Sequence, residues 1–293
     1  MESVILIFVD GLGIGQRSPA NPFSGIPHDV LTHYVDDEGR ALPYEGFIVR
    51  TDPRLGVQGR PQSASGQTTI LTGVNAPMTL GYHKQGFPNE KLRGVIGSHS
   101  IFLQIKQLGI GPALFANAYT PQFFSTTPRW KSATTCAVEA AGASFMRLPD
   151  LLGRKALFHD FTNQSLQTGG FGVPLFSAAE AGEILAGLST RHRFVLYEHF
   201  MTDKIGHDQD IQAAQDHLPL LASFVRHCLE SVDLKKITVI LTSDHGNIED
   251  LSIRNHTLND VPTMIWGRRS GFAASMINDL TDITPTIIKL LTE

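Results

Sequence analysis

The chain has 293 residues, of which 42% are hydrophobic and 18% charged, so it can bury the core of one large domain or of a domain with an insertion. This composition excludes a disordered or fibrous protein, and the formal net charge of −4 gives no electrostatic reason to expect nucleic acid or a membrane as partner. The N-terminal apolar run is too short for a signal peptide or a membrane span, which favours a cytoplasmic protein. Cys136 and Cys228 match no metal or redox spacing, and we expect reduced, buried thiols.

Short apolar, β-branched runs alternate with helical patterns along the chain. In chain order we expect a strand at 4–9, a helix at 100–108, a strand at 112–116, a helix at 178–188, a strand at 193–197, a helix at 209–229, strands at 237–242 and 262–266, and a helix at 284–291. This alternation is typical of an α/β layer fold with a mainly parallel sheet. In such sheets functional groups collect just beyond the carboxyl ends of the strands.

Residues 119–176 fit the alternation poorly, because they hold a Thr-Thr-Pro run, an alanine-rich segment and a glycine pair. We interpret them as a small insertion or cap beside the functional site. The rest of the chain, residues 1–118 and 177–293, would then form the core.

The first chemical signal is Asp10, which ends the predicted strand 4–9 and precedes Gly11 and Gly13. Glycines allow a sharp turn there and leave the carboxylate at the strand end. An aspartate that only caps the turn is the alternative interpretation.

The second signal is Ser63, at the start of a predicted helix that ends near Gly73. We interpret Ser63 as the N-cap of this helix, where backbone N–H groups and the helix dipole favour an anion. A metal ion in contact with the hydroxyl would lower its pKa and make it a nucleophile near neutral pH. Ser65 and Thr68 fall inside the helix, where a hydroxyl is commonly bonded to the preceding turn. An ordinary capping serine is the alternative.

The third signal is the pair Asp203 and His207, which follows the predicted strand 193–197. Side chains four residues apart can converge on one ion if the segment between them is helical or tightly turned. A structural histidine is the alternative.

Two further signals lie beside the last predicted strands. Asp244 and His245 follow the strand 237–242 and offer a carboxylate oxygen and an imidazole nitrogen, which suits Zn²⁺ or Mn²⁺. His256 precedes the strand 262–266. A turn with a structural histidine is the alternative for each motif alone, but all of them together favour a metal site.

These motifs resemble the alkaline phosphatase superfamily and, within it, the cofactor-independent phosphoglycerate mutases and phosphopentomutases. Residues 203–207 resemble their Asp-x-x-Gly-His element, and residues 242–247, Thr-Ser-Asp-His-Gly-Asn, resemble their Thr-Ala-Asp-His-Gly-Asn. Residues 255–262 are similar to their His-Thr and Val-Pro segment. The resemblance covers roughly 1–118 and 177–293, and it implies an alkaline-phosphatase-like three-layer α/β sandwich with a mainly parallel central sheet and a small inserted cap.

The resemblance also implies two divalent metal ions, Mn²⁺ or Zn²⁺, and divides the ligands between them. The two sets are Asp10, Ser63, Asp244 and His245 for one ion, and Asp203, His207 and His256 for the other. Ser63 would attack the phosphorus of a small phosphorylated metabolite and become a phosphoserine. The mutase motif places its nucleophile three residues before a glycine, and Ser63 stands three before Gly66.

Two departures from the mutases favour a phosphomonoesterase. The mutases carry histidine after the motif glycine, where this chain has Gln67, and they have a large cap whose arginines hold the sugar phosphate. The first alternative is a phosphomutase, which transfers the phosphoryl group within one substrate. The second alternative is a non-catalytic metal-binding protein. The sequence leaves the natural substrate and the oligomeric state open.

Other charged residues carry weaker signals. Candidate contacts for phosphate oxygens are His83, Lys84, Arg93 and Lys204, with solvated surface charge as the alternative for each. Glu249 is interpreted as a loop charge.

Overall fold

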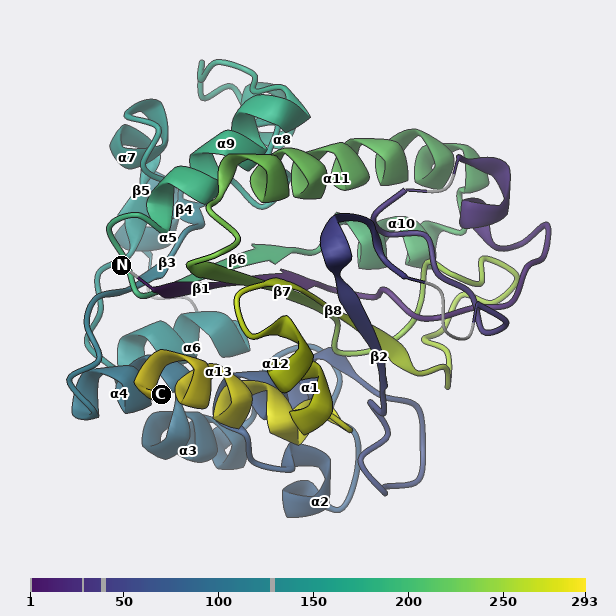
Figure 1. Cartoon of the computed structure of the whole chain (residues 1–293), viewed down its shortest axis with the longest axis horizontal. Coiled ribbons are helices and arrows are strands. Elements are labelled where there is room, and N and C mark those ends of the chain that lie inside the picture. The colour runs from purple at the N-terminus through teal and green to yellow at the C-terminus, as the bar shows by residue number, and fades with distance from the viewer. Residues whose placement is uncertain (1, 28, 38–40, 127–129) are drawn as a thin grey trace.

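The computed structural model describes residues 2–27, 29–37, 41–126 and 130–293, and it has three layers, a sheet between two sets of helices (Figure 1). The central sheet has six strands in the order β2-β8-β7-β1-β6-β3. Its strands are β1 (Ser3–Val9), β2 (Phe47–Thr51), β3 (Ala113–Phe115), β6 (Phe194–His199), β7 (Ile237–Thr242) and β8 (Val261–Gly267). A second sheet pairs β4 (Ala118–Tyr119) with β5 (Met146–Arg147).

The direction of the strands determines which chain segments meet at one edge of the sheet. Strands β7, β1, β6 and β3 are parallel, which confirms the predicted mainly parallel sheet. Strand β8 is antiparallel to both β7 and β2. Because Leu241 of β7 lies opposite Met264 of β8, the N-terminal end of β8 lies beside the carboxyl end of β7. A residue that precedes β8 therefore reaches the same edge as residues that follow β1, β6 and β7.

Helices cover both faces of the sheet (Figure 1). The layer drawn above the sheet in Figure 1 holds α7 (Leu148–Leu152), α8 (Gln164–Thr168), α9 (Ala178–Leu188), α10 (Met201–Asp208) and α11 (Ile211–Ser231). The layer drawn below holds α1 (Ser63–Thr72), α2 (Ala76–Leu80), α3 (Glu90–His99), α4 (Ile101–Gln107), α6 (Ala133–Ala140), α12 (Ser270–Met276) and α13 (Ile283–Thr292). The short helix α5 (Pro121–Ser125) follows β4.

Strand β1 shows why its sequence is apolar at every position. Ile5 and Ile7 pack into one core cluster with residues of α9 and α11, whereas Val4 and Leu6 pack into a second cluster with residues of α1 and α13. Because both faces of the strand are buried, its residues form a continuous apolar run without the alternation of a half-exposed strand.

The observed elements agree with the predicted ones except at a few positions. The predicted strand 237–242 coincides with β7, and the predicted helix 178–188 coincides with α9. The predicted helix 209–229 begins later, because Gln209 has a positive φ of 55° and Asp210 caps α11 with its side chain. Strand β2 was not predicted.

The predicted insertion, residues 119–176, contains α5, α6, β5, α7 and α8. Helix α6 packs against α1, α3 and α4, and its Ala137 and Val138 belong to a core cluster that includes the sheet. The domain boundaries and the role of this segment as a cap stay predictions.

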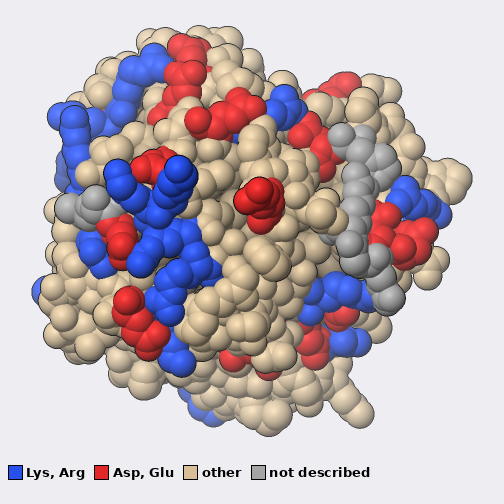
Figure 2. Space-filling view, in the orientation of Figure 1, with Lys and Arg blue, Asp and Glu red and all other residues tan. Residues whose placement is uncertain are grey.

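The surface carries charges of both signs. On the face shown in Figure 2, lysine and arginine side chains gather on the left, on the side of the N-terminus and α7, with acidic side chains among them. Cys136 and Cys228 are buried and free, as predicted. Within the described residues, no helix combines the length and the apolar character that crossing a membrane requires.

Candidate metal centre

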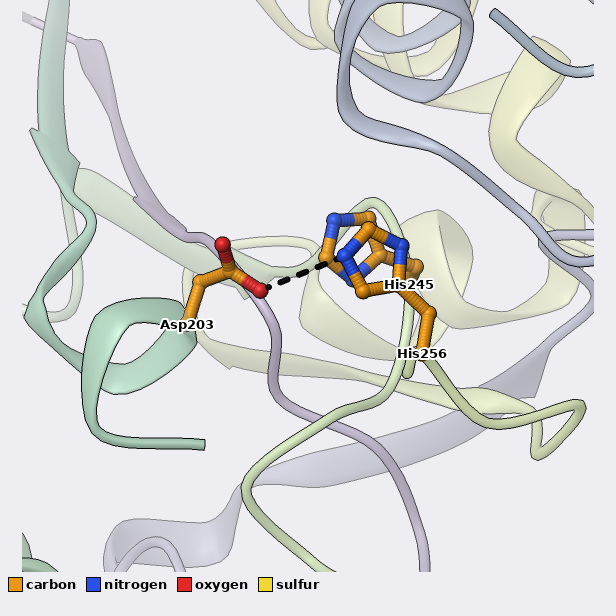
Figure 3. Close-up of side chains that lie close together, drawn as sticks. All are labelled: Asp203, His245 and His256. Atoms are coloured by element: carbon orange, nitrogen blue, oxygen red, sulfur yellow. Dashed lines mark ion pairs between the residues drawn. The ribbon is translucent and has the colours of Figure 1, made fainter. Parts of the chain in front are cut away.

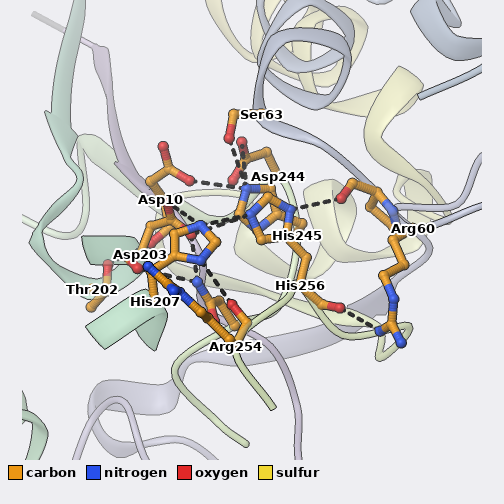
Figure 4. Close-up of polar contacts among 12 residues, drawn as sticks. Asp10, Arg60, Ser63, Thr202, Asp203, His207, Asp244, His245, Arg254 and His256 are labelled. Carbon is orange, nitrogen blue, oxygen red and sulfur yellow. Dashed lines mark hydrogen bonds and ion pairs between the residues drawn. The ribbon is translucent and has the colours of Figure 1, made fainter. Parts of the chain in front are cut away.

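The seven predicted site residues meet at one edge of the central sheet (Figure 4). The polar groups come from the segments after β1, β6 and β7, from the segment before β8, and from the first turn of α1: Asp10, Ser63, Asp203, His207, Asp244, His245 and His256. The antiparallel direction of β8 is what allows His256, which precedes its strand, to join residues that follow theirs.

One group of ligand atoms surrounds His245. Its Nε2 lies 3.1 Å from Asp10 Oδ1, 3.6 Å from Asp244 Oδ2 and 3.0 Å from Ser63 Oγ. Asp10, Asp244 and His245 each offer one ligand atom, and these atoms all lie within 4.8 Å of one another. This group contains the first predicted ligand set.

A second group of ligand atoms surrounds Asp203. On α10, Asp203 and His207 are one helical turn apart, and Asp203 Oδ2 lies 3.4 Å from His207 Nε2. Asp203 Oδ1 lies 3.5 Å from His256 Nε2, which in turn lies 3.2 Å from His207 Nε2. The rings of His245 and His256 stack with their centroids 3.6 Å apart, so the two groups adjoin (Figure 3).

Several of these atoms are buried without the hydrogen bonds that buried polar atoms normally make. Asp10 Oδ1 and both carboxylate oxygens of Asp244 have no hydrogen-bond partner. Within the described ranges, no lysine or arginine forms a salt bridge with Asp10, Asp203 or Asp244. Buried carboxylates that face one another without a counter-charge fit a site for divalent cations.

The electrostatics of these side chains support the same conclusion. Burial raises the pKa of Asp10 to about 6, and burial together with the nearby Asp10 and Asp203 raises the pKa of Asp244 well above its ordinary value. Burial lowers the pKa of His245 and His256 to about 4, so both imidazoles are neutral at pH 7. Neutral imidazole is the form that binds a metal ion.

Backbone carbonyls orient two of the histidines. The Nδ1 atom of His256 lies 2.9 Å from the carbonyl oxygen of Pro61, and that of His207 lies 2.8 Å from the carbonyl oxygen of Arg254. Each bond assigns the proton to Nδ1 and leaves Nε2, the atom that faces Asp203, free to act as a ligand.

Ser63 is the first residue of α1, and its capping position differs from the prediction. The N-cap is Gln62, which has extended backbone angles, and Ser63 is the first helical residue. The Ser63 hydroxyl does not cap the helix and instead lies 3.0 Å from His245 Nε2. The hydroxyls of Ser65 and Thr68 are bonded to the carbonyls of Gln62 and Ala64, as expected for serine and threonine inside a helix.

Two glycines allow this close approach of α1 and the loops. A Cβ atom at Gly66 would lie 2.8 Å from Asp244 Cβ, and one at Gly11 would lie 2.8 Å from Asp203 Cα. Gly11 also has a φ of +74°, which side chains disfavour. Glycine at both positions therefore follows from the packing of the site.

Glu249 is a buried residue of the site that the sequence analysis misinterpreted as a loop charge. It is 1% exposed, and its Oε2 accepts hydrogen bonds from the backbone N–H groups of Gly13 and Asn247. Its Oε1 accepts bonds from Thr257 and from Asn259. Glu249 thus connects the loop after β1, which carries Asp10, with two parts of the β7–β8 loop, which carries His245 and His256.

Two amides contact the carboxylate ligands directly. Asn247 Nδ2 donates to Asp203 Oδ1 at 2.7 Å, and Gln67 Nε2 donates to Asp10 Oδ2 at 3.0 Å. Both residues lie within motifs noted in the sequence, but neither was assigned a role there.

A cavity of about 590 Å³ opens onto the centre and reaches Asp10, Ser63 and Asp203. Of the four predicted phosphate contacts, Lys204 lines this cavity. The backbone N–H of Lys84 bonds to Ser65 Oγ, and His83 Nε2 lies 3.2 Å from the carbonyl oxygen of Val57. Arg93 bonds to the carbonyl of Pro88.

The C-terminal part of the chain matches a known family. Residues 174–292 match the model of the Metalloenzyme superfamily. A region of 127 residues is 30% identical to the 2,3-bisphosphoglycerate-independent phosphoglycerate mutase of Sulfurimonas denitrificans and covers 40% of this chain and 25% of that protein. The enzyme of the same name from Desulforudis audaxviator is 27% identical over 124 residues, or 40% of this chain and 24% of that protein. The matched region thus spans about a quarter of the length of these relatives.

Solved structures resemble the whole chain. The PH0037 protein of Pyrococcus horikoshii superimposes with a TM-score of 0.56 at 15% identity, over 99% of this chain and 96% of that one. A cold-active alkaline phosphatase from a psychrophilic Shewanella superimposes with a TM-score of 0.54 at 11% identity, over 99% and 100% of the two chains. The three-layer architecture is therefore shared with an alkaline phosphatase.

Proposed function

We propose that the chain is a metalloenzyme of the alkaline phosphatase superfamily that resembles the cofactor-independent phosphoglycerate mutases, and that it hydrolyses small phosphate monoesters through a phosphoserine at Ser63. The observation that carries the proposal is the position of the Ser63 hydroxyl, 3.0 Å from His245 Nε2, in a site where Asp10 Oδ1 and both carboxylate oxygens of Asp244 have no hydrogen-bond partner. This geometry supports a nucleophile within a metal site.

We propose two divalent ions, held by the two ligand sets that the sequence analysis defined. The oxygen and nitrogen donors suit both Mn²⁺ and Zn²⁺. Bound there, the ions would lower the pKa of the Ser63 hydroxyl and neutralise charge on the transferred phosphoryl group.

The side chains and the helix α1 orient the nucleophile and bind the phosphate of the substrate. Ser63 lies at the N-terminal end of α1, where the helix dipole is positive and favours the charge of a phosphate. Its oxygen forms a bond to phosphorus as the ester P–O bond breaks, and the leaving alcohol takes up a proton. Water then attacks the phosphoserine and releases inorganic phosphate. Lys204, exposed at the cavity, is placed to meet phosphate oxygens.

A phosphomutase is the second candidate, since the relatives matched by sequence are named phosphoglycerate mutases. Two observations favour the hydrolase. Gln67, the position at which the sequence departs from the mutase motif, is hydrogen-bonded to Asp10. Ser63 is half-buried and lines the cavity, so water can reach its hydroxyl.

The test uses metal-stripped protein refilled separately with Mn²⁺ and Zn²⁺. We expect metal-restored release of inorganic phosphate from monoesters and, after an acid quench, one phosphoryl group on the peptide that contains Ser63. Ser63→Ala should lower the rate at least about 1,000-fold while binding metal, because the six other ligands remain.

Ser65→Ala is the matched control, since its hydroxyl donates to the Gln62 carbonyl and accepts from the Lys84 backbone N–H, and we expect its activity to stay within about tenfold of the wild type. Full activity in Ser63→Ala would contradict the assignment of the nucleophile. Isomerised sugar phosphate without free phosphate would establish the mutase instead.

A further inference from the structure

We infer that the cavity beside Ser63 selects phosphomonoesters whose alcohol carries an aromatic ring, an inference that rests on the proposed function. The cavity has a volume of about 590 Å³, which is within the range of small-molecule sites. Seven of its 21 described lining residues are Phe, Tyr or Trp, whereas these residues make up 8% of the chain. The composition of the wall thus differs sharply from that of the molecule.

The aromatic rings form flat surfaces around the cavity. His159 and Phe200 stack with centroids 4.1 Å apart and an angle of 24° between their planes. Burial lowers the pKa of His159 to about 4, so this imidazole is an uncharged plane at pH 7. Tyr119 and Phe123 lie with centroids 4.1 Å apart. A ring that enters the cavity would contact aromatic surfaces in offset or edge-to-face geometry.

Exposed aromatic side chains gather at the mouth of the same cavity. Phe87 is 46% exposed, Trp130 57% and Phe200 39%. Phe87 and Trp130 stack on each other with an interplanar angle of 19°. Exposed apolar groups that gather at a concave site are typical of ligand binding, because a bound apolar ligand removes them from water.

The polar groups of the cavity do not match a sugar phosphate. Of the described residues that line the cavity, none is an arginine, and Lys131 is already paired with Glu139 at 2.8 and 2.9 Å. Among its polar side chains, Asn117 is bonded to the backbone of Glu198, and Thr135 is bonded to Tyr119 and Ser132. The hydroxyls of a phosphorylated sugar would compete with these bonds, which costs binding free energy. A flat apolar alcohol has no such cost.

The test compares benzyl phosphate with ethyl phosphate on the metal-loaded protein. Both substrates release a primary alcohol, so the comparison reports the aromatic ring rather than the quality of the leaving group. We expect kcat/KM for benzyl phosphate to exceed that for ethyl phosphate at least about tenfold, since the ring adds several buried carbons.

Replacing either of two equally exposed phenylalanines tests whether the preference for benzyl phosphate arises at this cavity. Phe87 at the cavity mouth and Phe47 on β2 are both 46% exposed. Phe87→Ala should lower the benzyl-to-ethyl ratio of kcat/KM at least about threefold, whereas Phe47→Ala should leave the ratio unchanged.

The outcomes separate this inference from the proposed function. Phosphate release from both esters with a ratio near one would overturn the aromatic preference and leave the hydrolase intact. If neither ester is hydrolysed, the hydrolase proposal fails, and calorimetry with benzylphosphonate and ethylphosphonate decides the inference. Tighter binding of benzylphosphonate, weakened in Phe87→Ala, supports the aromatic site, and equal binding of the two phosphonates overturns it.

Discussion

Glu249 is a buried side chain that positions the loops of the site without being one of the candidate metal ligands. Its carboxylate accepts four hydrogen bonds, one from the loop after β1 and three from the β7–β8 loop, and these two loops carry Asp10, His245 and His256. Burial raises the pKa of Glu249, whereas the bonds from Thr257 and Asn259 lower it. We regard Glu249 as a positioning residue, because it acts on the ligands through the backbone of their loops.

Replacing Glu249 with glutamine should weaken metal binding. The amide NH₂ would face groups that are themselves donors, so the loops would shift, and we expect the metal dissociation constant to rise about 10- to 100-fold. Competition with a chelator measures this change, and circular dichroism checks that the fold is retained. The control is Asp250→Asn, whose carboxylate bonds only within its own loop to residue Ser252. Equal affinities in Glu249→Gln and in the control would contradict the positioning role.

Helix α1 depends on glycine for its distance from the loop after β7. The Cβ position of Gly66 lies 2.8 Å from Asp244 Cβ and 2.9 Å from the Asp244 carbonyl oxygen, so no side chain fits there without a shift of the backbone. This contact fixes the start of α1, and hence Ser63, relative to the metal ligands.

A methyl group at Gly66 should therefore damage both stability and turnover. We expect Gly66→Ala to lower the free energy of unfolding by about 1–3 kcal/mol and to lower the rate of phosphate release at least about tenfold. Gly94 on α3 is the matched control, because a Cβ atom there meets nothing within 4 Å. Gly94→Ala should be neutral or stabilising by up to about 1 kcal/mol, as alanine favours helix. Urea unfolding and the phosphate assay measure the two effects.

The fold as a whole brings together carboxylates that repel one another. Asp10 and Asp203 both raise the pKa of Asp244, although these residues lie far apart in the sequence. A divalent ion bound between them would convert this repulsion into attraction in the folded state, and the unfolded chain has no such site.

Metal binding should therefore stabilise the whole molecule. At a free metal concentration of 100 times Kd, each site adds about 2.7 kcal/mol to the free energy of unfolding. We expect a chelator to lower the thermal midpoint by several degrees and Mn²⁺ or Zn²⁺ to restore it. In Asp244→Asn the thermal midpoints of the metal-free and metal-loaded protein should lie closer together than in the wild type. Identical midpoints with and without metal in the wild-type chain would argue against tight binding.

Much of the site could be predicted from local sequence. Asp10 and Asp244 follow buried apolar runs, and such runs identify strand ends without knowledge of their partners. The spacing of Asp203 and His207 allowed them to converge if their segment was helical or tightly turned, and α10 shows that it is helical. The capping role of Ser63 was predicted wrongly, because helix bounds shift by one residue according to contacts that the sequence does not display.

Local sequence patterns were enough to identify the candidate ligands and their places beside strands, since periodicity and glycine turns act over a few residues. The antiparallel direction of β8, which brings His256 to the other candidate ligands, is visible in the tertiary structure and not in the sequence. The same holds for Glu249, which joins the loop after β1 to the β7–β8 loop, and for aromatic residues from distant segments, such as Phe87 and Phe200, which meet at one cavity. Strand direction and the residues that share a cavity follow from long-range packing, which local patterns do not encode.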